Sequence, residues 1–137
     1  MGATMGLSQE LIHLAAAAII VGLITLFWAA ATARGQQNLA WAAGARDEAM
    51  PPLTGVAGRL ERAFRNFMET FPFFAAALLA AIVAQKTGPL TLWGSALYVI
   101  ARALYVPIYA AGIRLVRTLV WFVSIVGLLM VVVALFR

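Results

Sequence analysis

Four polar side chains recur at helical spacing in an otherwise largely apolar part of the chain. The stripe comprises Arg62, Arg65, Asn66 and Glu69. Residues spaced i, i+3, i+4, i+7 project from one face of an α-helix, because each residue advances about 100° around the axis. Arginine guanidiniums pair with carboxylates, and a buried glutamate can hold an ammonium group. Since ionisable side chains at membrane depth are costly and commonly functional, the stripe predicts a site for a ligand with charges of both signs.

A second polar stripe lies farther along the chain. Arg102, Tyr105 and Tyr109 are spaced i, i+3, i+7. Arg117 and Thr118 open the last apolar segment. Two such groups at one depth can converge, and their inventory suits a small peptide with two carboxylates and one amine. Glutathione is such a peptide, and it supplies the thiol that this sequence, which has no cysteine, lacks.

The same side chains permit a purely structural interpretation. Glu69 could pair with Arg62 or Arg65 and hold the helices together. Glu61 lies off the stripe and could pair with Arg65 one turn away. The residues alone leave internal pairing and ligand binding open.

The composition places the chain in a bilayer. Of the 137 residues, 64% are hydrophobic and 11% are charged, and the mean hydropathy is +0.96. A soluble domain of this length is far less apolar. The net charge of +5 lies next to apolar segments, which leaves no polar surface large enough for nucleic acid. A metal site is not expected, because the chain has no cysteine and a site built on the lone His13 would lack further ligands.

Four apolar segments predict an all-α integral membrane protein, a four-helix bundle forming a single domain over residues 1–137. The predicted spans are residues 11–33, 59–85, 90–110 and 118–136. Residues 34–58 are the most polar part of the chain, contain a Pro-Pro pair and form the one substantial loop. Pro72 has no N–H to donate, so we expect a kink or a loosened turn in the second span just beyond Glu69.

Basic residues near the ends of the spans predict the orientation. One side of the bundle carries Arg34, Arg46, Arg59, Arg62, Arg65, Arg102, Arg114 and Arg117. The other side carries only Lys86 and Arg137. The positive-inside rule therefore puts both termini outside the cytoplasm and the loop of residues 34–58 inside. Every candidate site residue then lies near one membrane face.

Several other side chains have ordinary membrane roles in this interpretation. Lipid-headgroup anchors are Arg59, Arg114 and Arg137. Residues of the interfacial aromatic belts or of the lipid-facing surface are Trp93, Tyr98 and Trp121. Frequent alanine and arginine with a single lysine favour a bacterial source, and hence a multi-pass protein of the inner membrane.

These motifs resemble those of a known family. The segment from Glu61 to Pro72, ERAFRNFMETFP, is similar to the signature of the MAPEG family, the membrane-associated proteins of eicosanoid and glutathione metabolism. That family includes microsomal glutathione transferases, prostaglandin E synthase and leukotriene C synthase. The resemblance continues in the run RALY that begins at Arg102, in Tyr109, and in the run RTLVW that begins at Arg117.

The resemblance implies a homotrimer that binds glutathione between adjacent subunits, near the cytoplasmic side. By motif, the implied glutathione-binding residues are Arg62, Arg65, Asn66, Glu69, Tyr105, Tyr109, Arg117 and Thr118. The predicted set also contains Arg34 and Arg102, the latter because it shares a helical face with Tyr105. Arg34 is included for its position at the end of the first span. Arg117 and Thr118, which stands where some members have serine, resemble the pair near the sulfur. Arg117 is therefore the implied stabiliser of the thiolate, and Tyr109 is the second candidate.

The implied function is that of a membrane-embedded glutathione-dependent transferase or peroxidase acting on a small lipophilic electrophile that enters from the bilayer. Conjugation, peroxide reduction and isomerisation all remain open. An alternative is a non-catalytic accessory or lipid-binding subunit of a larger membrane complex that retains the same fold. A drug-proton antiporter of similar length would need an acidic residue within residues 11–33, and there is none.

Overall fold

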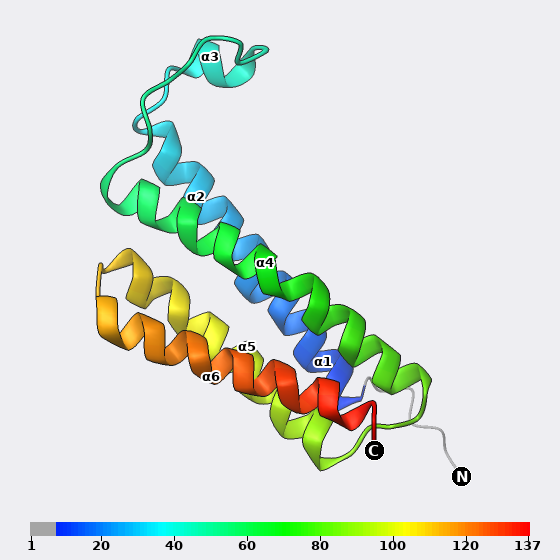
Figure 1. Ribbon diagram of the computed structural model, residues 1–137. Helices are drawn as coiled ribbons and strands as arrows, with labels where there is room; N and C mark the ends of the chain where they lie inside the picture. Colours follow the sequence, from blue (N-terminus) through cyan, green and yellow to red (C-terminus); the bar gives the residue numbers. More distant parts are fainter. Residues whose placement is uncertain (1–7) are drawn as a thin grey trace.

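A computed structural model describes residues 8–137, and residues 1–7 of the predicted domain lie outside that part. Four helices are long and apolar enough to cross a membrane (Figure 1). The first span is a continuous run of α1 (Gln9–Ala16), a π-helical segment η1 (Ala17–Leu23) and α2 (Ile24–Arg34). The other elements are the short α3 (Leu39–Ala43), α4 (Gly55–Val83), α5 (Pro89–Ala110) and α6 (Arg114–Ala134).

The helices pack as two pairs, which are joined by α4 and, at the other end of the bundle, by contacts of α1 and η1 with α5. α2 lies along α4, and α5 lies along α6, while α4 also contacts both α5 and α6 (Figure 1). The connections from α2 to α4 and from α5 to α6 lie at the same end of the bundle (Figure 1). This arrangement brings the first half of α4, which bears the first polar stripe, to the end of α5 and the start of α6.

Two glycines allow α5 and α6 to approach closely. A Cβ on Gly94 would lie 2.8 Å from the carbonyl oxygen of Gly127, and a Cβ on Gly127 would lie 2.6 Å from the carbonyl oxygen of Gly94. Any larger residue at either position would have to push the two backbones apart. Small residues at such crossings are typical of membrane helices, where close backbone contact replaces the hydrophobic effect as the source of association.

An aromatic pair fixes α4 against α5. The rings of Phe74 and Tyr98 are stacked with centroids 3.9 Å apart, and both side chains are fully buried. The Tyr98 hydroxyl lies 2.9 Å from Thr70 Oγ1, so its polar end is satisfied inside the bundle. The prediction that Tyr98 belongs to an interfacial or lipid-facing surface is therefore wrong, because the ring faces α4 rather than the outside.

Two polar contacts join α1 to α5 at the other end of the bundle. Thr91 Oγ1 donates to Glu10 Oε1 at 3.0 Å, and His13 Nδ1 lies 2.7 Å from Ser95 Oγ. Thr91, Ser95 and Glu10 are buried, so these contacts satisfy polar groups that would be costly to leave unpaired. His13 is thus engaged by a hydroxyl rather than by other metal-binding side chains.

Several helix ends differ from the predicted bounds. α6 begins at Arg114 rather than Thr118, because Gly112, at φ +78°, turns the chain directly after α5. α4 begins at Gly55 rather than residue 59. The predicted loop contains α3, whose first turn is capped by Asn38: its Oδ1 accepts from the N–H of Ala40 at 2.8 Å. α4 continues as one helix through Pro72, so the kink or loosened turn expected beyond Glu69 does not interrupt it.

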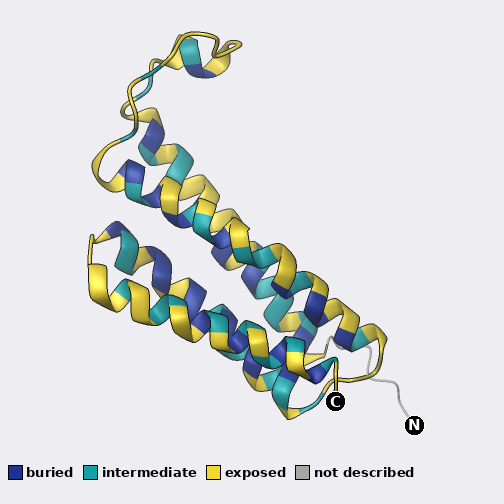
Figure 2. Ribbon diagram, viewed as in Figure 1, coloured by how far each residue is buried: buried dark blue, intermediate teal, exposed yellow. Residues whose placement is uncertain are grey.

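Large apolar side chains cover the outer faces of the helices. Figure 2 shows exposed residues along the outward sides of all four spans. Examples are Phe27, Phe73, Trp93, Leu119 and Phe122. Exposed apolar surface on this scale is expected where acyl chains or other transmembrane helices are the surroundings. Together with the four spans, it indicates a multi-pass integral membrane protein.

Candidate functional site

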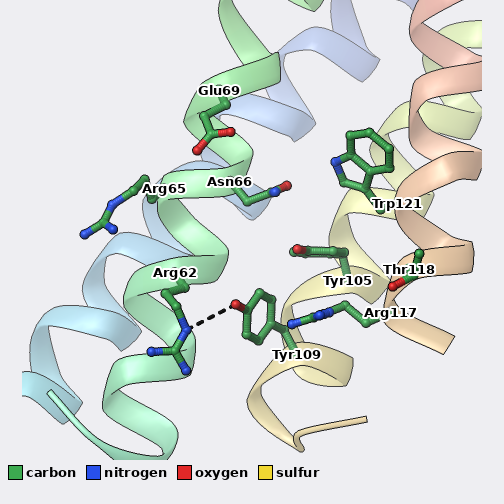
Figure 3. A pocket seen from close by; sticks show the side chains of 9 residues that line it. All are labelled: Arg62, Arg65, Asn66, Glu69, Tyr105, Tyr109, Arg117, Thr118 and Trp121. Carbon is green, nitrogen blue, oxygen red and sulfur yellow. Dashed lines mark hydrogen bonds between the residues drawn. The ribbon is translucent and has the colours of Figure 1, made fainter. Parts of the chain in front are cut away.

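A cavity of about 390 Å³ lies between α4, α5 and α6. Figure 3 shows its lining side chains, which come from the three helices. They are Arg62, Arg65, Asn66, Glu69, Tyr105, Tyr109, Arg117, Thr118 and Trp121. All except Trp121 were predicted from the sequence as site residues. The two polar stripes do converge, since α4 packs against the end of α5 and the start of α6.

The α4 wall carries both signs of charge. Arg65 Nη2 pairs with Glu61 Oε1 at 2.7 Å, which is the only ion pair within residues 8–137. In Figure 3 the Arg65 side chain points away from Tyr105 and Trp121. Glu69 is exposed and has no ion-pair partner among the described residues. Glu61 and Arg65 therefore form an internal ion pair, as the structural interpretation of the sequence allows, whereas Glu69 is left available to a cation.

Tyr109 links the three walls of the cavity. Arg62 Nε donates to the Tyr109 hydroxyl at 3.2 Å. Arg117 approaches the same ring from α6, with its Cζ 4.4 Å from the ring centroid, and Figure 3 shows Tyr109 between the two arginines. Tyr105 meets Tyr109 edge-on, with centroids 5.5 Å apart. Two guanidiniums held against one aromatic side chain concentrate positive charge at this end of the cavity, which favours an anion there.

Arg102 lies behind the cavity rather than in its lining. The side chain is 1% exposed, and its Nη2 donates to Asn66 Oδ1 at 2.8 Å. Its Cζ is 4.5 Å from the centroid of the Tyr105 ring and 5.8 Å from that of Phe67. Arg102 was predicted as a ligand contact because it shares a helical face with Tyr105. Within this chain Arg102 does not reach the cavity, because Asn66 and Tyr105 cover its guanidinium on that side.

Arg34 is the other predicted residue that does not line the cavity. It ends α2, is exposed, and donates from Nη1 to Gln37 Oε1 at 2.7 Å. The prediction placed it in the site for its position at the end of the first span. Within one chain the geometry does not bring it there, because α2 lies along α4 and the cavity is bounded by α4, α5 and α6.

Trp121 is the one lining residue that was not predicted from the sequence. It was assigned to the membrane interface or to the lipid-facing surface, but it faces the cavity and its indole Nε1 is buried without a hydrogen-bond partner among the described residues. The spacing could have identified Trp121 as a lining residue, because it stands four residues after Arg117 and three after Thr118. Side chains at this spacing share one face of a helix.

The sequence that builds this cavity matches a known family over nearly its whole length. Residues 12–137 match the MAPEG family. The chain belongs to the MAPEG family. The resemblance and the four-helix membrane-bundle fold predicted from the sequence are thereby confirmed. No curated protein and no solved structure matched this MAPEG chain. Membership alone leaves its activity open, because MAPEG proteins include both glutathione transferases and non-catalytic members.

Proposed function

We propose that this MAPEG protein is a membrane-embedded glutathione-dependent transferase or peroxidase that acts on a small lipophilic electrophile. The observation that supports this most directly is the mixed charge of the cavity between α4, α5 and α6. Three arginines line it together with Glu69, whose carboxylate is not neutralised by any described residue. A stripe that served only to hold the helices together would have paired that carboxylate.

The lining groups match the parts of glutathione. Arg62 offers guanidinium N–H groups for a carboxylate of the tripeptide. Glu69 offers an acceptor for its ammonium group. Asn66 and Tyr105 offer polar groups for its amide backbone, and Asn66 is oriented for this by Arg102.

The proposed chemistry depends on the thiolate form of the bound tripeptide. A guanidinium beside the sulfur lowers the pKa of the thiol, because it stabilises the charged form. Arg117 is the proposed group, and its contact with the Tyr109 ring holds it in place. In conjugation the thiol proton passes to water, the sulfur forms a bond to the electrophilic carbon, and the bond from that carbon to its leaving group breaks. Tyr109 is the second candidate for stabilising the sulfur.

We also propose that the protein is a homotrimer with glutathione between adjacent subunits, as the resemblance implies. Arg34 does not line the cavity of its own chain, so it would need a second copy to contact the ligand. The exposed apolar faces of the helices offer surface for such packing. Light scattering that reports a monomer in detergent would contradict the trimer.

Binding of reduced glutathione to the purified protein tests the proposal. Calorimetry in detergent should show saturable binding, and the protein should conjugate a generic electrophile such as a chlorinated nitrobenzene. Wild-type protein without saturable binding would falsify the enzyme hypothesis. Isolation in fixed stoichiometry with an unrelated membrane complex, in the absence of glutathione binding, would favour the non-catalytic subunit instead.

A further inference from the structure

A second cavity, of about 330 Å³, adjoins the candidate glutathione site. We call it the basic cavity, since its lining includes Arg59, Arg62, Arg114 and Arg117 together with Tyr109 and Gly112. No acidic side chain from residues 8–137 lines it. Arg62, Tyr109 and Arg117 are shared with the first cavity, whereas Arg59 and Arg114 line the basic cavity alone.

The four arginines of the basic cavity lack counter-charges. Arg59 Nε donates to the carbonyl oxygen of Ala110 at 2.8 Å, and Arg62 and Arg117 contact Tyr109. Arg114 is exposed. None of the four takes part in an ion pair among residues 8–137. Four formal positive charges therefore share one small space with nothing on the described chain to offset their repulsion.

The helix ends at the basic cavity reinforce its preference for anions. α6 begins at Arg114, and its N-cap residue, Ile113, provides no side-chain hydrogen bond. Neither α4 nor α6 has an acidic residue in its first turn. Because a helix N-terminus already carries partial positive charge, arginines there are unfavourable for the helix alone. An anion bound between them would interact favourably with both the dipoles and the guanidiniums.

We propose that the basic cavity binds a phosphate group. Guanidinium forks from α4 and α6 can contact several oxygens of one phosphate at once, whereas a carboxylate offers two oxygens that a single fork satisfies. The lining residues lie towards the ends of membrane-length helices, where lipid headgroups are expected. The phosphate can therefore come from a phospholipid headgroup or from a free phosphate or soluble phosphate ester.

Two binding measurements distinguish these sources. The protein, purified in a phosphate-free maltoside detergent, is titrated with inorganic phosphate against sodium chloride at equal ionic strength, and the thermal unfolding midpoint is followed. In parallel, native mass spectrometry compares retention of phosphatidylglycerol with that of diacylglycerol, which has the same tails without phosphate. A saturable shift with phosphate identifies a soluble ligand, and selective retention of phosphatidylglycerol identifies a headgroup. Either result supports the proposal.

Variants confined to the basic cavity locate the site. Arg59→Gln and Arg114→Gln should each weaken phosphate-group binding about tenfold, as expected for one charge-assisted hydrogen bond. Arg46→Gln, which removes one charge from the loop after α3, should change it less than about twofold. The hydrogen bond from Arg59 to Ala110 supports the end of α5. If Arg59→Gln does not fold, Arg59→Lys takes its place, because lysine keeps a donor to Ala110.

Two results would overturn the basic cavity as a phosphate site. One is the absence of a saturable response in both binding measurements. The other is an equal loss of binding in Arg46→Gln and Arg114→Gln, which would indicate only general attraction of anions to a basic surface. Arg114→Gln should still bind glutathione as the wild type does, since Arg114 does not line the first cavity. This measurement separates the phosphate proposal from the proposed glutathione site.

Discussion

The guanidinium carbon of Arg117 lies 4.4 Å from the centre of the Tyr109 ring. A charge carried by α6 therefore rests against an aromatic side chain of α5, and the hydroxyl of that side chain accepts from Arg62 on α4. Three consecutive helices of the chain meet through one tyrosine. The position of Arg117 depends on this contact, and so does the chemistry proposed for it.

Removal of Arg117 should change the ionisation of bound glutathione. In Arg117→Ala the pKa of the bound thiol should rise by about 1 unit, because the charged form loses a neighbouring opposite charge. The rate of conjugation plotted against pH should move to higher pH by the same amount. The ultraviolet absorbance of the thiolate during a pH titration provides the measurement. Arg46→Ala is the matched control, and an unchanged profile in Arg117→Ala would assign the sulfur to another group.

Tyr109→Phe isolates the hydroxyl group. The ring that Arg117 contacts is kept, but the acceptor for Arg62 Nε at 3.2 Å is lost. Glutathione affinity should fall about three- to tenfold, the usual effect of one hydrogen bond to a charged group that positions a ligand contact. Tyr98→Phe removes a hydroxyl that bonds Thr70 away from the cavity, so it should lower stability and leave affinity unchanged. Equal affinity in wild type and Tyr109→Phe would rule out this role.

Glu69→Gln tests whether the unpaired carboxylate holds the ammonium group of glutathione. The dissociation constant should rise about tenfold, because one charge-assisted hydrogen bond is replaced by a neutral one. A glutathione analogue without the amine should bind wild type and variant equally, and this comparison is decisive for the assignment. Glu61→Gln serves as the control on the same helix, since Glu61 pairs with Arg65 and does not line the cavity.

Arg102 and Asn66 should be energetically coupled. Their charge-assisted hydrogen bond at 2.8 Å is partly buried and Arg102 itself is buried, so a double-mutant cycle of Arg102→Met and Asn66→Ala should show a coupling of about 1.5–3 kcal/mol in the free energy of unfolding. Glutathione affinity should fall in either single variant. If the two substitutions have additive effects, the contact contributes nothing to the architecture of the site.

The close crossing of α5 and α6 predicts an unequal response of two glycines. Gly94→Ala should reduce the free energy of unfolding by about 1–3 kcal/mol, because the new Cβ would lie 2.8 Å from a backbone oxygen of α6. A Cβ on Gly88 meets nothing within 4 Å, so Gly88→Ala should change stability by no more than about 0.5 kcal/mol. Chemical denaturation in detergent measures both, and similar values would show that the crossing can relax.

Much of the fold and most of the cavity lining could be predicted from the sequence. Long uncharged segments define membrane-length helices, and the spacing of Arg62, Asn66 and Glu69 alone defines a helical face. The meeting of the two polar stripes could also be predicted, because both lie at the same depth in the membrane by their positions in the spans. These features depend on local periodicity, which a sequence displays directly.

The remaining features depend on which side chains cover one another. Arg102 and Tyr105 share a helical face, yet Arg102 is buried and Tyr105 lines the cavity, because Asn66 from another helix closes over the guanidinium. The early start of α6 follows from the φ angle of Gly112. For Trp121, its spacing from Arg117 was available in the sequence, but an aromatic residue near a span end fits the membrane interface equally well.

The concealed position of Arg102 bears on how this protein could acquire new substrates. Asn66 and Tyr105 form the floor of the cavity and also cover Arg102 inside the bundle. Substitutions of these residues therefore alter folding and ligand geometry together. Thr118 and Trp121, on the first turns of α6, line the cavity without covering Arg102. Diversification of chemistry among relatives with this architecture should therefore concentrate on that helix, while the arginine beneath the floor stays unchanged.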